Sequence, residues 1–187
     1  PKRSPSWDRR PPTGSWFARG SGEPPMVIEV REALFADAEG ILQVLNPIIE
    51  TGLYSAMKTP LTLAEQRAFL AGFTKRGVFI VAADGETLVG LQSIEPAPGR
   101  SADPEIGEIS TFVRLGSHRR GIGRALHAQT LLGAKARGYR TLIATIRADN
   151  PRALAYYRSL GFVKTARWDE GDSSVVRTEI QVSTETT

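Results

Sequence analysis

The chain has 187 residues, of which 41% are hydrophobic and 24% are charged, and its formal net charge at pH 7 is +4, which is typical of one globular domain with its own core. The absence of cysteine excludes disulfides, thiolate nucleophiles and cysteine metal sites. No stretch approaches the roughly 18 uninterrupted apolar residues of a membrane span, so we expect a cytoplasmic protein with no membrane partner.

Residues 1–25 differ in composition from the rest of the chain. They carry five Lys or Arg residues against two acidic ones, and they are dense in Pro, Gly and Ser without apolar periodicity. Such a composition predicts a disordered basic arm, followed by one domain over 26–187. Because the arm holds Trp7, Trp16 and Phe17, contact with nucleic acid is one hypothesis for it. We favour an upstream extension without a function and expect no nucleic-acid partner.

The domain begins with a predicted strand and two predicted helices. Residues 26–30 are rich in β-forming side chains. A helix is expected to follow with Asp37 as its N-cap and to bend or end at Pro47. Thr62 and Glu65 have the spacing of a capping box at the start of the second helix.

A hairpin and a further strand are predicted next. Two apolar runs, 78–83 and 87–94, flank the dipeptide Asp84-Gly85, and such a dipeptide favours a tight turn between antiparallel strands. After a loop rich in Pro and Gly, another strand is expected at about 106–114. This strand leads into a glycine-bearing junction and a helix.

The second half of the domain alternates helices and strands. The helix after the junction has an apolar stripe that begins at Ile122, and Gly138 ends it. A short strand at 141–146 precedes a helix with Asn150 as its N-cap. The last strands are expected near 162–168 and 174–182. This alternation predicts an α/β fold with a mixed sheet, helices on both faces and a right-handed crossover.

Two glycines, Gly121 and Gly123, stand at the junction between the strand and the helix. Glycines there let several backbone N–H groups converge on one small volume, to which the helix dipole adds positive potential. Arg119, Arg120 and Arg124 flank this volume, so a diphosphate is a suitable ligand. The third glycine of the dinucleotide pattern and the G-K-[ST] of the P-loop are both missing. Taken alone, an ordinary helix N-terminus with solvated arginines remains an equal alternative.

The segment HRRGIGRAL, together with NPRALAYYRSLGF from residue 150 onward, resembles the two acetyl-CoA motifs of the GCN5-related N-acetyltransferase (GNAT) superfamily. The resemblance covers roughly 26–183. It implies a single domain with a central mixed, mostly antiparallel twisted sheet and helices on both faces. The first family motif reads R/Q-x-x-G-x-G/A. His118 takes its first position when Gly121 and Gly123 are aligned, and Arg120 takes it in a shifted register.

The resemblance implies a binding site for acetyl-CoA, the co-substrate. No metal is expected, since His118 and His127 are the only histidines and show no ligand cluster. In the strand before the loop, main-chain groups pair with the pantetheine arm like an added strand. The loop amides hold the diphosphate, and Asn150 lines the other side, while its cap of the helix is a structural role compatible with ligand contact. The residues so assigned are Phe112, Val113, Leu115, Arg119, Arg120, Gly121, Ile122, Gly123, Arg124 and Asn150.

Tyr157 is the candidate general acid. It lies four residues before Gly161, where the family pattern Y-x-x-x-G-F has a phenol aimed at the thioester sulfur, and a phenol with a pKa of about 10 stays protonated at neutral pH. Ala153, Tyr156, Tyr157 and Leu160 also form an apolar helical stripe, for which core packing is the ordinary interpretation. The resemblance favours the acid role for Tyr157 and packing for Tyr156.

Glu108 is the candidate general base. It shares a strand face with Ser110 and Phe112, and a carboxylate in a strand of the sheet interior is costly unless it is used. The phosphinothricin acetyltransferase-like branch of the superfamily has a glutamate as far before its first loop glycine as Glu108 lies before Gly121. In the alternative, Glu108 is exposed at the start of the strand, and Glu105 replaces it.

The resemblance implies an acetyl-CoA-dependent N-acetyltransferase that acetylates the primary amine of a small molecule by direct attack, without an acetyl-enzyme. The segment NPIIETGLYSAMKTP resembles the branch's acceptor-pocket segment, so we expect an amino acid or an analogue such as a phosphinic or sulfoximine amino acid. The chain after Gly161 departs from the branch. Other acceptors therefore stay open, namely a protein N-terminus, a polyamine or an aminoglycoside. A non-catalytic acyl-CoA sensor is the alternative function, and a homodimer is an open alternative for the oligomeric state.

Overall fold

Seven strands form one sheet in the residues that this computed structural model describes, which are 28–55, 57–97, 103–170 and 173–182. They follow the order β1-β2-β3-β4-β5-β7-β6, and only β4 and β5 are parallel neighbours. The mixed, mostly antiparallel sheet is therefore confirmed, whereas the arm predicted over 1–25 lies outside the described residues. The strands are β1 (Ile28–Glu32), β2 (Val78–Asp84), β3 (Thr87–Pro96), β4 (Ile106–Val113), β5 (Thr141–Arg147), β6 (Val163–Glu170) and β7 (Ser173–Gln181).

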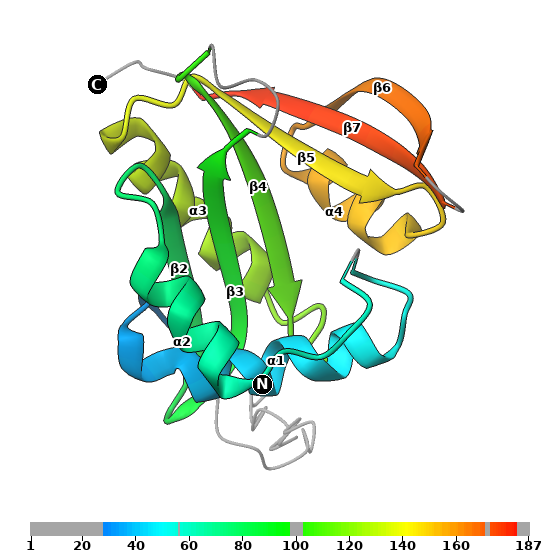
Figure 1. Cartoon of the computed structure of the whole chain (residues 1–187). Helices are drawn as coiled ribbons and strands as arrows, with labels where there is room; N and C mark the ends of the chain where they lie inside the picture. Colours follow the sequence, from blue (N-terminus) through cyan, green and yellow to red (C-terminus); the bar gives the residue numbers. More distant parts are fainter. Residues whose placement is uncertain (1–27, 56, 98–102, 171–172, 183–187) are drawn as a thin grey trace, which may run out of the picture.

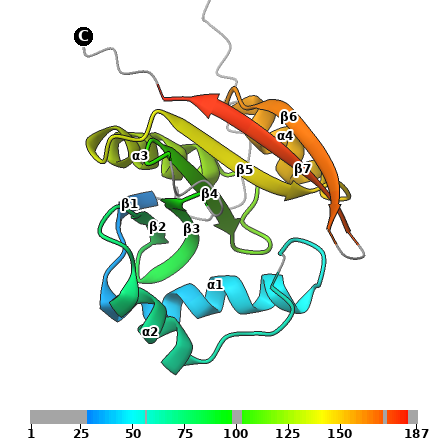
Figure 2. The ribbon, with the colours of Figure 1, turned by 45° about the horizontal axis from the view of Figure 1, so that its top comes forward.

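Helices cover both faces of the sheet, as predicted. One pair packs on the first half of the sheet, while the other pair lies behind it (Figures 1 and 2). Among the described residues, no helix combines the length and the apolar character that crossing a membrane requires. The helices are the 3₁₀ turn η1 (Phe35–Asp37), then α1 (Ala38–Glu50) and α2 (Leu63–Gly72) on one face, and α3 (Ile122–Ala136) and α4 (Pro151–Ser159) on the other.

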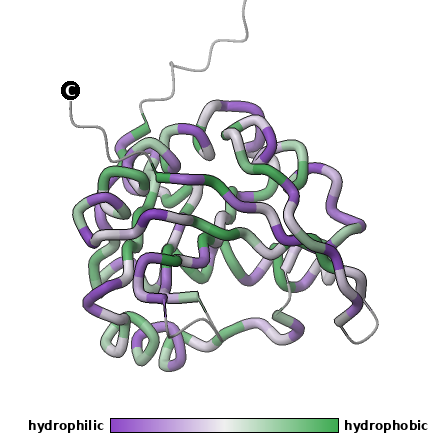
Figure 3. The backbone as a smooth tube through the Cα atoms, turned by 90° about the horizontal axis from the view of Figure 1, so that it is seen from above, coloured by the Kyte–Doolittle hydropathy of each residue, from purple (hydrophilic) through white to green (hydrophobic). Residues whose placement is uncertain are grey.

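The core consists of two apolar layers separated by the sheet. One layer joins α1 to the sheet around Ile41 and Val81, and the other joins α3 and α4 to it around Ile80 and Leu126. Successive residues of a strand point to opposite faces, so Ile80 and Val81 enter different layers. Strand stretches through the middle of the molecule are accordingly hydrophobic (Figure 3).

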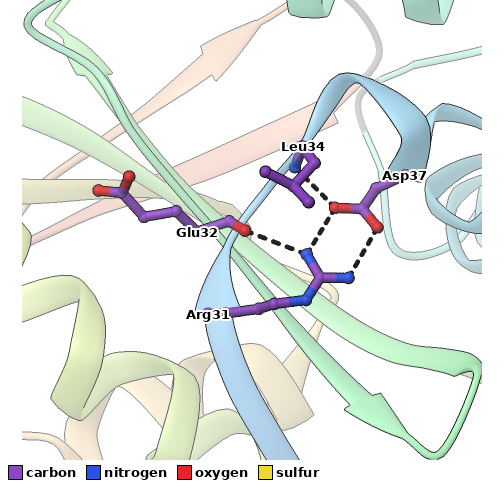
Figure 4. Close-up of polar contacts among 4 residues, drawn as sticks. All are labelled: Arg31, Glu32, Leu34 and Asp37. Atoms are coloured by element: carbon purple, nitrogen blue, oxygen red, sulfur yellow. Dashed lines mark hydrogen bonds and ion pairs between the residues drawn. The ribbon is translucent and has the colours of Figure 1, made fainter.

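Asp37 is the N-cap residue of α1, as predicted, but its side chain makes no capping hydrogen bond to that helix. Its carboxylate instead accepts two hydrogen bonds from Arg31, at 2.7 and 2.8 Å, and one from the N–H of Leu34 at 2.7 Å (Figure 4). The hydrogen bonds from Arg31 hold the pKa of Asp37 below its ordinary value. The carboxylate thus closes the 3₁₀ turn and ties β1 to the start of α1.

Pro47 lies inside α1, so the prediction that the helix could end there is wrong. A proline in a helix removes one backbone hydrogen bond and crowds the preceding turn. The residues on either side of it, Val44, Ile48 and Ile49, are buried against the sheet, and this apolar burial offsets the loss. The extra turn carries Ile48 toward the end of β4.

The sheet opens between β4 and β5. These strands pair only at Ile106–Thr141, Gly107–Leu142 and Glu108–Ile143. Beyond that point they diverge, and β5 continues along β7 (Figure 1). Along its remaining length β4 pairs with β3 alone, so main-chain groups on its other edge face the opening.

Candidate active site

A cavity of about 830 Å³ lies where β4 and β5 diverge, a size typical of small-molecule sites. Residues of α1, β4, α3 and α4 line it, together with the loop between β4 and α3. Glu108 and Arg120 are absent from its lining. The predicted residues that do line it are Phe112, Val113, Leu115, Arg119, Gly121, Ile122, Gly123, Arg124, Asn150 and Tyr157.

The loop before α3 has the backbone geometry of an anion-binding nest. Arg119 has φ 64° and Gly121 has φ 79°, so two left-handed residues alternate with others, an arrangement that turns successive N–H groups to one side. Gly121 caps α3 without a side-chain hydrogen bond. The amides of Ile122 and Gly123 open the helix and have no carbonyl one turn earlier to accept from them. These amides are available to a ligand.

Positive side chains complete this end of the cavity. Arg119 and Arg124 line it, as does His118, whereas Arg120 does not. Of the two motif registers left open by the sequence, this arrangement matches the one that begins at His118. An arginine at a left-handed φ costs about 1 kcal/mol relative to an ordinary conformation, which is typical of backbone held in place at a functional site.

The free edge of β4 offers main-chain groups to the opening. The N–H of Arg114 donates to the carbonyl of Val89 at 2.9 Å. Main-chain groups alternate between the two edges of a strand, so Phe112, two residues earlier, also pairs with β3. The groups of Thr111 and Val113 therefore point toward β5, and Phe112 contributes its side chain to the cavity instead.

Tyr157 belongs to both the core and the cavity. It is 5% exposed and packs edge-on against Tyr156 and Phe162. Its Oη lies 2.9 Å from Thr111 Oγ1 and 3.4 Å from the carbonyl oxygen of Ile109. Burial raises the pKa of the Tyr157 phenol well above its ordinary value, so the group keeps its proton at neutral pH.

Glu108 lies at the closed end of the opening and is half-buried, not exposed. It faces Glu95 across the β3–β4 ladder, and the pKa of Glu95 is raised by burial and then by the charge of Glu108. Its alternation along β4 puts it on the α1 face of the sheet. Glu105, the alternative base, is exposed and pairs with Arg140 at 3.1 Å.

Asn150 performs the structural role predicted for it. Its side chain accepts a hydrogen bond from the N–H of Ala153 at 3.0 Å, which caps α4. The same residue lines the cavity. The helix cap and a contact with a ligand are therefore compatible at this position.

Several residues of the cavity lining were not predicted from the sequence. Ile48 and Tyr54 line it from α1 and the segment that follows, and the resemblance of that segment to an acceptor pocket was the available signal. Thr111 and Tyr156 carried no such signal, because their neighbours come from distant parts of the chain. Tyr156 was predicted to pack only, yet its hydroxyl donates to the carbonyl of Gly123 at 2.8 Å.

Residues 49–162 match the family model described as the Acetyltransferase (GNAT) family. The chain belongs to this family. The fold and the family membership agree with the resemblance found in the two glycine-bearing motifs. The protein is accordingly an acetyl-CoA-dependent N-acetyltransferase, and its relatives bear the names of acetyltransferases.

Three relatives illustrate the similarity. Phosphinothricin N-acetyltransferase of Streptomyces viridochromogenes is 26% identical over 140 residues, which cover 75% of each chain. L-methionine sulfoximine/L-methionine sulfone acetyltransferase of Pseudomonas paraeruginosa is 28% identical over 140 residues, covering 73% of this chain and 81% of the relative. The solved structure of a GNAT superfamily phosphinothricin acetyltransferase from Sinorhizobium meliloti with acetyl-CoA has the same fold, with a TM-score of 0.74 at 22% identity, covering 83% of this chain and 89% of that one.

Proposed function

We propose that this enzyme transfers the acetyl group of acetyl-CoA directly to the primary amine of a small molecule, and that the acceptor is an amino acid or an amino acid analogue. The two curated relatives named for phosphinothricin and for methionine sulfoximine support this class of acceptor. The observation that carries the proposal is the cavity at the β4–β5 opening, because the amide nest and the Tyr157 phenol both line it.

The residues of the cavity suit acetyl-CoA. The nest between Arg119 and Gly123 would hold the diphosphate, and Arg119 and Arg124 would add fixed positive charge. The free main-chain groups of Thr111 and Val113 would pair with the amides of the pantetheine arm, as in the addition of a strand. When bound, acetyl-CoA supplies an acetyl group activated as a thioester.

Glu108 and Tyr157 would perform the two proton transfers. A primary amine attacks only in its neutral form, so Glu108 would accept its proton, directly or through water. Tyr157 Oη would give a proton to the departing sulfur. The two residues approach the opening from opposite faces of the sheet, because Glu108 lies on the α1 face and Tyr157 bonds to residues of the other face. The acceptor would therefore enter on the α1 side, beside Ile48 and Tyr54.

A thiol-release assay with acetyl-CoA tests the proposal against a panel of amino acids, phosphinic and sulfoximine analogues, polyamines, aminoglycosides and short peptides. Turnover confined to the amino acids and analogues is the expected result. A preference for peptides would assign the protein to N-terminal acetylation and overturn the acceptor class. Heat of coenzyme A binding by calorimetry, without thiol release for any acceptor, would indicate a sensor.

A further inference from the structure

A chain of hydrogen bonds joins Tyr157 to the first turn of α3. Gln92, on β3, donates from Nε2 to Thr111 Oγ1 at 2.7 Å and to Tyr156 Oη at 3.2 Å. Thr111 Oγ1 lies 2.9 Å from Tyr157 Oη, and Tyr156 Oη donates to the carbonyl of Gly123 at 2.8 Å. The proposed acid and the nest are thus linked through one buried amide.

The direction of these hydrogen bonds follows from the carbonyl of Gly123, the last acceptor in the series. A carbonyl oxygen only accepts, so the single proton of the Tyr156 hydroxyl is used by Gly123. The Tyr156 oxygen must then accept from Gln92, which fixes the NH₂ of the amide on this side. The same NH₂ donates to Thr111. The Thr111 hydroxyl also neighbours the Tyr156 oxygen, but that oxygen already accepts from Gln92. The proton of the Thr111 hydroxyl is therefore left for the Tyr157 oxygen, 2.9 Å away.

The proton of Tyr157 is consequently not used by Thr111. Its other acceptor in the described chain is the carbonyl of Ile109, and 3.4 Å is long for an O–H···O hydrogen bond. We infer that Gln92 is a positioning residue that keeps the proton of Tyr157 available to the departing sulfur, by making Thr111 a donor to the phenol. This inference rests on the proposed function of Tyr157 as the general acid.

The environment of Gln92 argues against a role in stability alone. Its side chain is 0% exposed, and its Oε1 has no partner among the described residues. A buried acceptor without a donor costs stability, whereas methionine would fill a similar volume without that cost. Replacement of Gln92 by methionine should therefore spare the fold. In that variant no amide donates to Thr111, so its hydroxyl accepts from Tyr157 as readily as it donates. The proton of the phenol is then bound to Thr111 for part of the time and is less available to the sulfur.

The test compares Gln92→Met, Tyr157→Phe and the double variant, with the acceptor that the thiol-release panel identifies. Gln92→Met should lower kcat by about tenfold, a part of the 10²–10⁴ that a general acid supplies. The KM for acetyl-CoA and the thermal unfolding temperature should stay nearly unchanged. In the Tyr157→Phe background the same substitution should have no further effect, because Gln92 acts through the lost phenol.

Two controls accompany the cycle. Gln66 is also a buried glutamine, 2% exposed and outside the cavity lining, and its Nε2 has no partner among the described residues, so Gln66→Met should leave kcat unchanged. Thr111→Val, the second control, removes the hydroxyl that donates to Tyr157 and should lower kcat as much as Gln92→Met does. The inference would be overturned if Gln92→Met lowered kcat equally in the unmodified and the Tyr157→Phe backgrounds. It would also be overturned if the fall in kcat were explained by a lower thermal unfolding temperature.

A readout without an acceptor separates this inference from the proposed function. The thiol pKa of bound coenzyme A, followed by the ultraviolet absorbance of the thiolate, should be lowered in the unmodified enzyme because Tyr157 donates to the thiolate. Gln92→Met should raise it toward the Tyr157→Phe value. A change with Tyr157→Phe but none with Gln92→Met would refute the role of Gln92 and leave the acid intact. No change with either variant would refute the acid itself.

Discussion

Gly121→Ala should weaken the binding of coenzyme A more than it affects turnover at saturation. Gly121 has φ 79°, and a Cβ built there meets no atom within 4 Å, so the substitution is opposed by backbone conformation and not by a clash. Alanine in this left-handed region costs about 1–2 kcal/mol. A loop that relaxes to a right-handed φ avoids this cost but turns the amides of the nest away from the cavity.

The expected result is a Kd for coenzyme A raised about tenfold, since 1.4 kcal/mol corresponds to a factor of ten. Isothermal calorimetry measures it, and thermal unfolding reports how much strain remains in the fold. Gly85→Ala is the matched control, because Gly85, in the turn between β2 and β3, has φ 59° and also meets nothing within 4 Å. It should lower stability without any change in Kd. If Gly121→Ala and Gly85→Ala had the same Kd for coenzyme A, the assignment of the nest as the diphosphate site would be refuted.

Three further predictions concern the proton-transfer groups and the start of the domain. Tyr157→Phe and Glu108→Gln should each lower kcat by about 10²–10⁴ with acetyl-CoA affinity nearly intact, and unchanged rates in both would exclude the proposed roles. Because burial raises the pKa of Tyr157, its protonated form persists, and kcat should show no alkaline decline attributable to this phenol below about pH 10; a decline that Tyr157→Phe abolishes would contradict this. The pKa of Asp37 is lowered by the hydrogen bonds from Arg31, so their stabilisation is present above the ordinary aspartate pKa of about 3.9 and is lost as the pH falls through the lower folded-state value. Asp37→Asn should therefore reduce the unfolding temperature at pH 7, with the difference narrowing in acid, and an equal difference at both pH values would count against the ion pair.

The sequence allowed the sheet and its helices to be predicted from local patterns, and the resemblance of two motifs to a known family predicted about half of the cavity lining. Gly121 has the left-handed φ that a glycine at this junction favours. Thr62 forms the predicted capping box with Glu65. Features that depend on other segments were missed. Asp37 is the N-cap residue of α1 as predicted, but the sequence did not indicate that its carboxylate would bind Arg31 of β1 instead of capping the helix.

The hydrogen-bond chain behind Tyr157 illustrates the same limit. Gln92 and Tyr156 are 64 residues apart in the chain, and their contact depends on how α4 lies against β3. The apolar stripe of α4 predicted correctly that Tyr156 turns inward. It did not indicate that the Tyr156 hydroxyl would accept from the buried amide of Gln92 and donate to the carbonyl of Gly123. Polar pairing across layers depends on the packing of elements that share no sequence signal.

The opening between β4 and β5 is the structural basis of the transfer that we propose between two bound molecules. Elsewhere along the described strands, backbone pairing separates the α1 face from the α3 face. Where β5 leaves β4 after Glu108, a thioester bound on one side and an amine bound on the other would meet without crossing the sheet. In the proposed mechanism Glu108 would lie on the side of the amine and Tyr157 on the side of the sulfur. Orientation would supply most of the rate in such an arrangement, so the proposed mechanism depends on the divergence of these two strands.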